Sequence, residues 1–229
     1  MTIVCRPWSL LLLAELVGAC GHAAAQAAPT GGQASPTAVG LLPPGGYGSL
    51  TQSDLSLRVR TGDLDVRFVP LDARVTRLLA RDSWESLRSL VASHRVQLDS
   101  VARMSGTSRP GLAFVSFFAQ SANARFDPQT LTIVVRGREL RPVGIVPFSG
   151  RFTAQQLNVR EQVSAIYLYS EDLPVNDSFT IKYGGETSDD WQSKQATLDR
   201  ERARVASRSR DSVGDSTGVG AGPDTAVSR

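Results

Sequence analysis

The stretch from Leu112 to Ala119 reads LAFVSFFA and is apolar at nearly every position. A run of this length, apolar on both alternations, is typical of a central β-strand that is covered on both faces. A second run of the same kind, VSAIYLY, extends from Val163 to Tyr169. The two runs predict two buried strands of a mainly β domain.

Three further segments alternate apolar and polar residues and predict half-buried strands at 131–135, 139–147 and 179–183. Gly137, which lies between the first two, predicts a tight hairpin. Pro142 and Pro147 favour an edge position or a bulge for the return strand, because proline has no backbone N–H to donate to a neighbouring strand. Short strands divided by Pro and Gly turns favour a β-sandwich over residues 111–186.

Upstream of these strands, residues 51–105 predict a β-hairpin followed by helices. Apolar and polar residues alternate over 55–60 and again over 64–68, on either side of a Gly-containing turn. Apolar residues then recur at helical spacing after Asp72, a suitable N-cap, and again over 84–91. The fold class is therefore α+β, mainly β, and we expect this segment to pack on the β-sandwich.

Residues 191–210 predict a C-terminal helix, because they lack Gly and Pro and their charges alternate in sign. We expect the helix to be mostly solvated, with weak packing by its apolar residues Trp191, Leu198 and Val205. The flanking segments 26–50 and 211–229 are rich in small and polar residues. They predict a disordered linker and a disordered tail, because they cannot bury enough apolar surface to offset chain entropy.

The first 25 residues have the three parts of a secretory signal peptide. Arg6 precedes an apolar stretch that begins at Leu10, and small residues then offer cleavage after Ala25 or Ala27. The apolar stretch is about ten residues long, too short for a helix to cross the hydrocarbon core of a membrane. We expect export to the periplasm or the cell exterior.

The sequence offers a second cleavage site, immediately before Cys20. The sequence Val17-Gly18-Ala19-Cys20 resembles a bacterial lipobox, in which the cysteine is lipidated and becomes the first mature residue. Glu15 lies five residues earlier and counts against this reading, since a carboxylate inside the apolar stretch is costly. The alternatives are a cleaved, free protein and a protein attached to a membrane only through a lipid on Cys20.

Composition excludes several functional classes. Hydrophobic residues make up 41% and charged residues 21% of the 229 residues, as in average globular proteins rather than coiled coils or collagen. The net charge is +3, and arginines are interleaved with acidic residues, so we expect no nucleic-acid partner. Both cysteines, Cys5 and Cys20, lie in the first twenty residues, which excludes a disulfide scaffold.

The chain offers few residues for catalysis. Once the signal is removed by either A-x-A cut, His94 is the only histidine, and its place at the end of a predicted helix favours a capping role. A zinc site needs three or four nitrogen or sulfur ligands, which the mature chain lacks. We therefore expect no catalytic residue, no metal and no cofactor.

Two surface features are candidates for binding. Three arginines, Arg136, Arg138 and Arg141, surround the predicted hairpin turn and could contact a partner protein. The acidic residues Glu186, Asp189 and Asp190 lie beside Trp191, a combination of carboxylates and an aromatic ring that could bind or act on a carbohydrate.

The order of strands and turns over residues 112–184 resembles the immunoglobulin-like β-sandwich of bacterial exported proteins and lipoproteins of unknown function. In that family a Leu-x-x-x-Glu-x-Val stretch opens a core strand, and Leu157, Glu161 and Val163 match it. The family usually has Pro-Gly just before the glutamate, where this chain has Val159-Arg160. The resemblance implies no catalytic residues.

Taken together, these features predict an exported cell-envelope protein that acts as a non-catalytic interaction module, with another envelope protein as its partner. The alternative is a carbohydrate-binding or carbohydrate-active protein that uses the acidic loops near Trp191.

Overall fold

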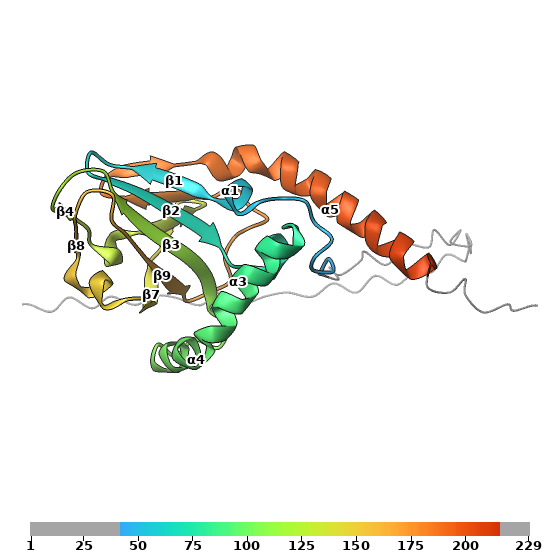
Figure 1. The fold of residues 1–229 in the computed structure, drawn as a ribbon, viewed down its shortest axis with the longest axis horizontal. Helices are drawn as coiled ribbons and strands as arrows, with labels where there is room; N and C mark the ends of the chain where they lie inside the picture. Colours follow the sequence, from blue (N-terminus) through green and yellow to red (C-terminus); the bar gives the residue numbers. More distant parts are fainter. Residues whose placement is uncertain (1–41, 216–229) are drawn as a thin grey trace, which may run out of the picture. The chain divides into compact units, whose positions relative to one another are not determined.

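The computed structural model describes residues 42–215, and the side chains of residues 42–209. Within this part, the strands β1–β11 form three antiparallel sheets, and helices lie outside them (Figure 1). The expected α+β, mainly β fold class is confirmed.

The largest sheet has five strands in the order β1-β2-β3-β9-β7. Their bounds are β1 Leu57–Arg60, β2 Leu64–Pro70, β3 Gly111–Ala119, β9 Gln162–Tyr169 and β7 Pro142–Pro147. The hairpin β1–β2 is thus not a separate segment packed on the sheet, as the sequence suggested, because β2 pairs with β3 along seven residues. β3 and β9 are central, as their apolar runs predicted, and β7 is an edge strand.

The second sheet has four strands in the order β11-β10-β5-β6. Their bounds are β11 Glu186–Ser188, β10 Thr180–Tyr183, β5 Thr132–Val135 and β6 Arg138–Leu140, while β4 Ala124–Arg125 and β8 Gln156–Leu157 form a separate pair. The β5–β6 turn places Arg136 (φ 50°) and Gly137 (φ 78°) in the left-handed region, as a type I′ turn requires. The predicted return strand 139–147 is divided at Arg141, with β6 in one sheet and β7 in the other.

The main core lies between the two large sheets, because alternate side chains of each strand point to the same side. Phe117 of β3 stacks on Phe126 with 4.7 Å between ring centroids, and meets Tyr183 of β10 edge-on at 5.5 Å. Phe68 of β2 likewise meets Phe179 at 6.3 Å. Aromatic side chains from distant parts of the sequence therefore hold the two sheets together.

Helices α3 (Arg81–Ser93) and α4 (Arg95–Met104) cover one half of the outer face of the five-stranded sheet. Helices α1 (Gln52–Leu55) and α2 (Ala73–Thr76) contribute Leu55 and Val75 to the main core, and two 3₁₀ turns span Pro128–Thr130 and Gly150–Ala154. Asp72 caps α2 by accepting the backbone N–H of Arg74, as expected. Leu98 of α4 forms a second apolar cluster with Val146, Ile166 and Leu168, so β9 is buried on both faces.

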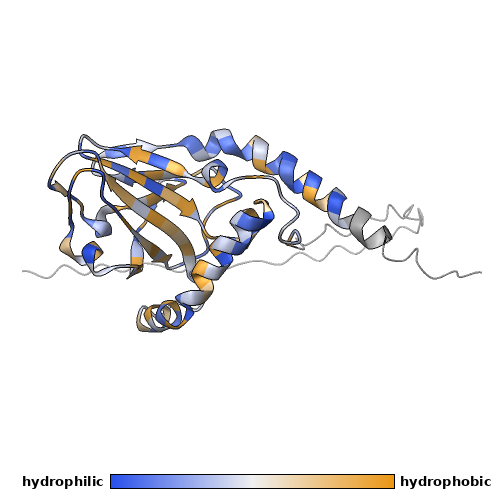
Figure 2. Cartoon of the chain, in the orientation of Figure 1, coloured by the Kyte–Doolittle hydropathy of each residue, from blue (hydrophilic) through white to orange (hydrophobic). Residues whose placement is uncertain are grey.

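The C-terminal helix α5 (Asp190–Asp215) is longer than predicted and is part of the core. The expectation of weak packing is wrong: Trp191, Leu198 and Val205 are all buried. These residues are seven apart and form a narrow apolar stripe. The rest of α5 is largely hydrophilic (Figure 2). The indole N–H of Trp191 donates to the carbonyl of Val175 at 3.2 Å.

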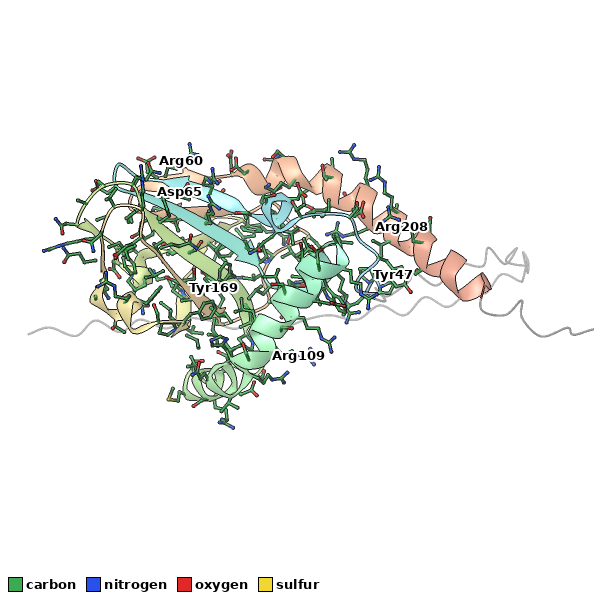
Figure 3. All side chains as sticks on the ribbon, viewed as in Figure 1. Tyr47, Arg60, Asp65, Arg109, Tyr169 and Arg208 are labelled. Carbon is green, nitrogen blue, oxygen red and sulfur yellow. The ribbon has the colours of Figure 1, made fainter. Side chains whose placement is uncertain are left out.

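The last residues of the predicted linker are held against α5, which corrects that expectation for residues 42–50. Glu201 is 1% exposed and accepts hydrogen bonds from the backbone N–H of Ser49 at 2.7 Å and from its hydroxyl at 2.9 Å. Arg208 donates to the carbonyl of Tyr47 at 2.7 Å (Figure 3). Leu50 forms a parallel bridge with Leu79, so the chain enters the fold as an ordered segment.

Among the described residues, no helix has the length and apolar composition that a membrane span needs.

Candidate binding groove

The three arginines around the β5–β6 hairpin do not form an unpaired basic patch. Each is close to a carboxylate: Arg136 to Asp177, Arg138 to Glu171 and Arg141 to Glu139. All three arginines are more than 60% exposed, so these contacts are surface ion pairs of small energetic value. Three carboxylates nevertheless lie beside these arginines, although Glu139 is shared with Lys182 at 3.4 Å. Their negative charge weakens this surface as a site for an acidic partner.

The acidic residues near Trp191 lack an accessible aromatic partner. Trp191 is fully buried, and its ring lies tilted beside that of Phe179 with 5.0 Å between ring centroids. It cannot serve as a platform for a sugar ring, which corrects the expectation. Glu186, Asp189 and Asp190 are exposed, and no group of three or more metal-ligating side chains occurs among the described residues.

Other titratable groups have structural roles. His94 ends α3, and its Nδ1 lies 2.9 Å from the carbonyl oxygen of Leu90, the capping position expected for it. Burial raises the pKa of the Tyr167 and Tyr169 hydroxyls, and raises that of Tyr183 to about 12. The predicted lipidation residue, Cys20, lies outside the described residues.

A groove of about 880 Å³ lies where the helical cover of the five-stranded sheet stops, between α3 and the exposed half of the sheet. We call it the serine groove. Seven serines line it: Ser53, Ser56, Ser86, Ser89, Ser93, Ser116 and Ser164. Those of α3 recur at spacings of three and four, which places them on one side of the helix.

One row of side chains crosses four strands at the floor of the serine groove. Arg58 of β1 is directly opposite Arg67 of β2, Arg67 is opposite Ser116 of β3, and Ser116 is opposite Ser164 of β9. Directly opposed residues point to the same face of an antiparallel sheet. The strand register therefore brings two guanidinium groups and two hydroxyls into a single line.

The two arginines of this row differ in their electrostatic surroundings. Arg58 lies 3.4 Å from the carboxylate of Asp65, which is also 3.9 Å from Arg60 (Figure 3). Among the described residues, Arg67 has no carboxylate partner and no side-chain hydrogen bond. Opposed like charges on neighbouring strands are unfavourable, so a negative group placed over the row would relieve their repulsion.

The other end of the groove is apolar. Leu90 and the rings of Phe114 and Phe148 line it, and the two rings stack with 5.9 Å between centroids. His94 adds a third ring, 4.5 Å from that of Phe148. The groove thus offers a cationic row with hydroxyls at one end and an aromatic surface at the other, and its only charged lining residues are the two arginines.

Sequence reasoning missed the serine groove, although one signal was available. Ser116 and Ser164 are the single polar residues within the two apolar runs that predicted the central strands. Their pairing across β3 and β9 marks the point at which the sheet stops being covered by apolar helix side chains. The arginines of the row could be assigned to the same face only once the register was known.

Comparison of the chain with protein-family models, curated proteins and solved structures finds no match.

Proposed function

We propose that the two large sheets form an immunoglobulin-like sandwich. The strand order supports this. In the immunoglobulin order, strands A, B, E and D form one sheet and G, F and C the other, with C′ added beside C in the variable type. The orders β2-β3-β9-β7 and β11-β10-β5-β6 follow the same sequence of neighbours. On this assignment, β1 extends the first sheet and α2–α4 are inserted between strands A and B.

The turn before β9 also supports the resemblance. The backbone N–H of Glu161 donates to the carbonyl of Asn158 at 3.0 Å, which closes a four-residue turn. Arg160 has a φ of 65°, the conformation that glycine adopts most readily, at the position where the family has glycine. Glu161 accepts the backbone N–H of Asn158 at 2.8 Å, and this hydrogen bond is the main cause of its lowered pKa.

We further propose that the protein is exported and acts in the cell envelope. The support is the three-part signal in the sequence, which lies ahead of the ordered entry at residues 47–50. The intact mass of the mature N-terminus, measured on protein isolated from cells, tests this. Cleavage before Gln26 or Ala28 would indicate a free exported protein, and a lipid-modified N-terminus at Cys20 would indicate attachment. An uncleaved Met1 in protein from the envelope fraction would contradict the proposal.

We propose that the protein is a non-catalytic binding module, and that the serine groove receives an acidic segment of a partner protein. The observation that carries this is the row Arg58–Arg67–Ser116–Ser164, in which Arg67 has no carboxylate among the described residues. A carboxylate of the partner would pair with Arg67. An apolar side chain beside it would reach Phe114 and Phe148.

Display selection with the purified mature protein tests this proposal. We expect the wild type to enrich peptides in which Asp or Glu is followed closely by a large apolar residue. Arg67→Glu should weaken binding of the selected peptides by at least about tenfold, since a charge-assisted pair is replaced by repulsion. Titration of a labelled selected peptide measures the change.

The matched control is Arg125→Glu, which makes the same charge change at an exposed arginine that lies outside the groove. It should bind as the wild type does. Equal binding by Arg67→Glu, or selection of peptides without carboxylates, would reject the serine groove as an acidic-segment site. Circular dichroism melting of both variants checks that neither change unfolds the protein.

A further inference from the structure

A second hollow lies on the opposite flank of α3 from the serine groove. It has a volume of about 710 Å³ and includes Leu71, Thr76 and Trp84 in its lining. Three arginines also line it, one from each of three neighbouring segments: Arg77 follows α2, Arg88 lies on α3 and Arg95 begins α4. We call this hollow the arginine cleft. None of its lining residues is acidic.

The three guanidinium groups of the arginine cleft are only partly neutralised. Arg77 donates to the carbonyl of Pro43 at 3.2 Å and has no carboxylate partner within residues 42–209. Arg88 lies over the ring of Trp84, 5.5 Å from the centroid. Arg95 pairs with Asp99 at 3.2 Å, but the side chains are 73% and 54% exposed, and such surface pairs contribute little.

The segment that supplies every lining residue of the cleft except Gly45 carries a net positive charge. Residues 71–110 contain seven arginines and four acidic residues, so their net charge of +3 equals that of the whole chain. Two of the four acidic residues are paired outside the cleft: Asp72 with Arg74, and Glu85 with Arg81. A third, Asp99, pairs with Arg95 of the cleft itself, so Arg77 and Arg88 are the cleft arginines without a carboxylate partner among the described residues.

We propose that the arginine cleft binds a phosphate group. Guanidinium groups offer paired N–H donors that match phosphate oxygens. Contact with the face of Trp84 restricts Arg88 before a ligand arrives. The hydroxyl of Thr76 adds a further donor. This site is distinct from the serine groove, and the inference does not depend on the proposed function of that groove.

The phosphate could belong to a soluble molecule or to a lipid headgroup. Two exposed apolar residues of the neighbouring helix α4 distinguish these two sources. Val96 and Met104 of α4 are 81% and 78% exposed, the highest values among the exposed large hydrophobic residues of the described chain. Binding to an anionic membrane surface would bury such side chains at the interface. A soluble phosphate compound would not contact them.

The test uses the purified mature protein and two probes. Pyrophosphate is titrated calorimetrically, and phosphatidylglycerol vesicles are compared with phosphatidylcholine vesicles in co-sedimentation. We expect saturable binding of at least one phosphate probe, weakened at least about tenfold by Arg88→Gln. Arg125→Gln, which removes a charge outside the cleft, should bind as the wild type does. Arg67→Glu should also retain binding, which separates this site from the serine groove.

The pattern of binding identifies the source of the phosphate. Pyrophosphate binding that is lost in Arg88→Gln but kept in Val96→Asp assigns a soluble ligand. Selective binding to phosphatidylglycerol vesicles that is lost in both variants assigns a lipid headgroup. Absence of binding to both probes, or binding that Arg88→Gln leaves unchanged, would overturn the proposal.

Discussion

Trp191→Ala is expected to lower the free energy of unfolding by about 3–5 kcal/mol, the range for removing a large buried aromatic side chain. Trp191 is fully buried, its ring lies 5.0 Å from that of Phe179, and its indole N–H donates to Val175. Its loss would leave a cavity at the start of α5 and remove one of the two hydrogen bonds that the carbonyl of Val175 accepts, the other coming from Gln195. Urea unfolding followed by far-UV circular dichroism measures the change.

Two further variants separate the contributions of this tryptophan. Trp191→Phe keeps a ring beside Phe179 and removes the indole donor, so a smaller loss of about 1–2 kcal/mol is expected. Trp84→Ala removes a tryptophan that is only partly buried, and it should cost less than Trp191→Ala. A loss below about 1 kcal/mol in Trp191→Ala would mean that α5 does not belong to the core.

The second large effect is expected at Glu201. Glu201→Ala should lower the free energy of unfolding by about 1.5–3 kcal/mol, because two hydrogen bonds from Ser49 to a charged acceptor are lost. The carboxylate holds Ser49 through two hydrogen bonds and lies 3.4 Å from Arg204 and 3.5 Å from Arg208. The same urea titration measures the loss, and hydrogen exchange at Ser49 should accelerate.

Controls for Glu201 are available on the same helix. Glu201→Gln keeps an oxygen that can accept from Ser49 and should lose less stability than the alanine variant. Asp199→Ala removes a carboxylate that is 68% exposed and pairs with Arg202, so a change within about 0.5 kcal/mol is expected. If Glu201→Ala and Asp199→Ala have equal effects, the two hydrogen bonds from Ser49 to Glu201 make no contribution to stability.

Local patterns in the sequence were sufficient to predict most strands. The two apolar runs became the central strands β3 and β9, because a strand that is buried on both faces must be apolar at both alternations. The two prolines of residues 142–147 correctly indicated an edge. The assignment of strands to sheets could not be predicted, because pairing depends on contacts between distant segments. The sequence of the hairpin β1–β2 therefore did not reveal that it belongs to the same sheet as β3.

The role of α5 was missed for a different reason. A helix that buries one large apolar residue in seven has a narrow apolar stripe, which its many charged residues conceal in an average over the segment. The ordered part of the linker was missed because its partner, Glu201, lies 152 residues away from Ser49. No composition of residues 42–50 could reveal an acceptor supplied by the other end of the chain.

The candidate sites show the same limit. Like residues that are close in sequence predicted binding surfaces at Arg136–Arg141 and at the acidic loop before Trp191. In the fold, carboxylates lie beside the three arginines, and the ring of Trp191 is buried. The serine groove and the arginine cleft are built from residues spread over 113 and 51 positions of the sequence, respectively. Each becomes visible only when strand register and helix placement bring its members together.

The edge strand β7 has a consequence for the protein at high local concentration. Its pairing with β9 is irregular between Pro142 and Gly144, and prolines stand at both of its ends. An exposed edge with free backbone donors would allow copies of the chain to add to one another strand by strand and grow into fibres. Prolines and an irregular register interrupt such growth. Addition of further copies along the β7 edge is therefore disfavoured.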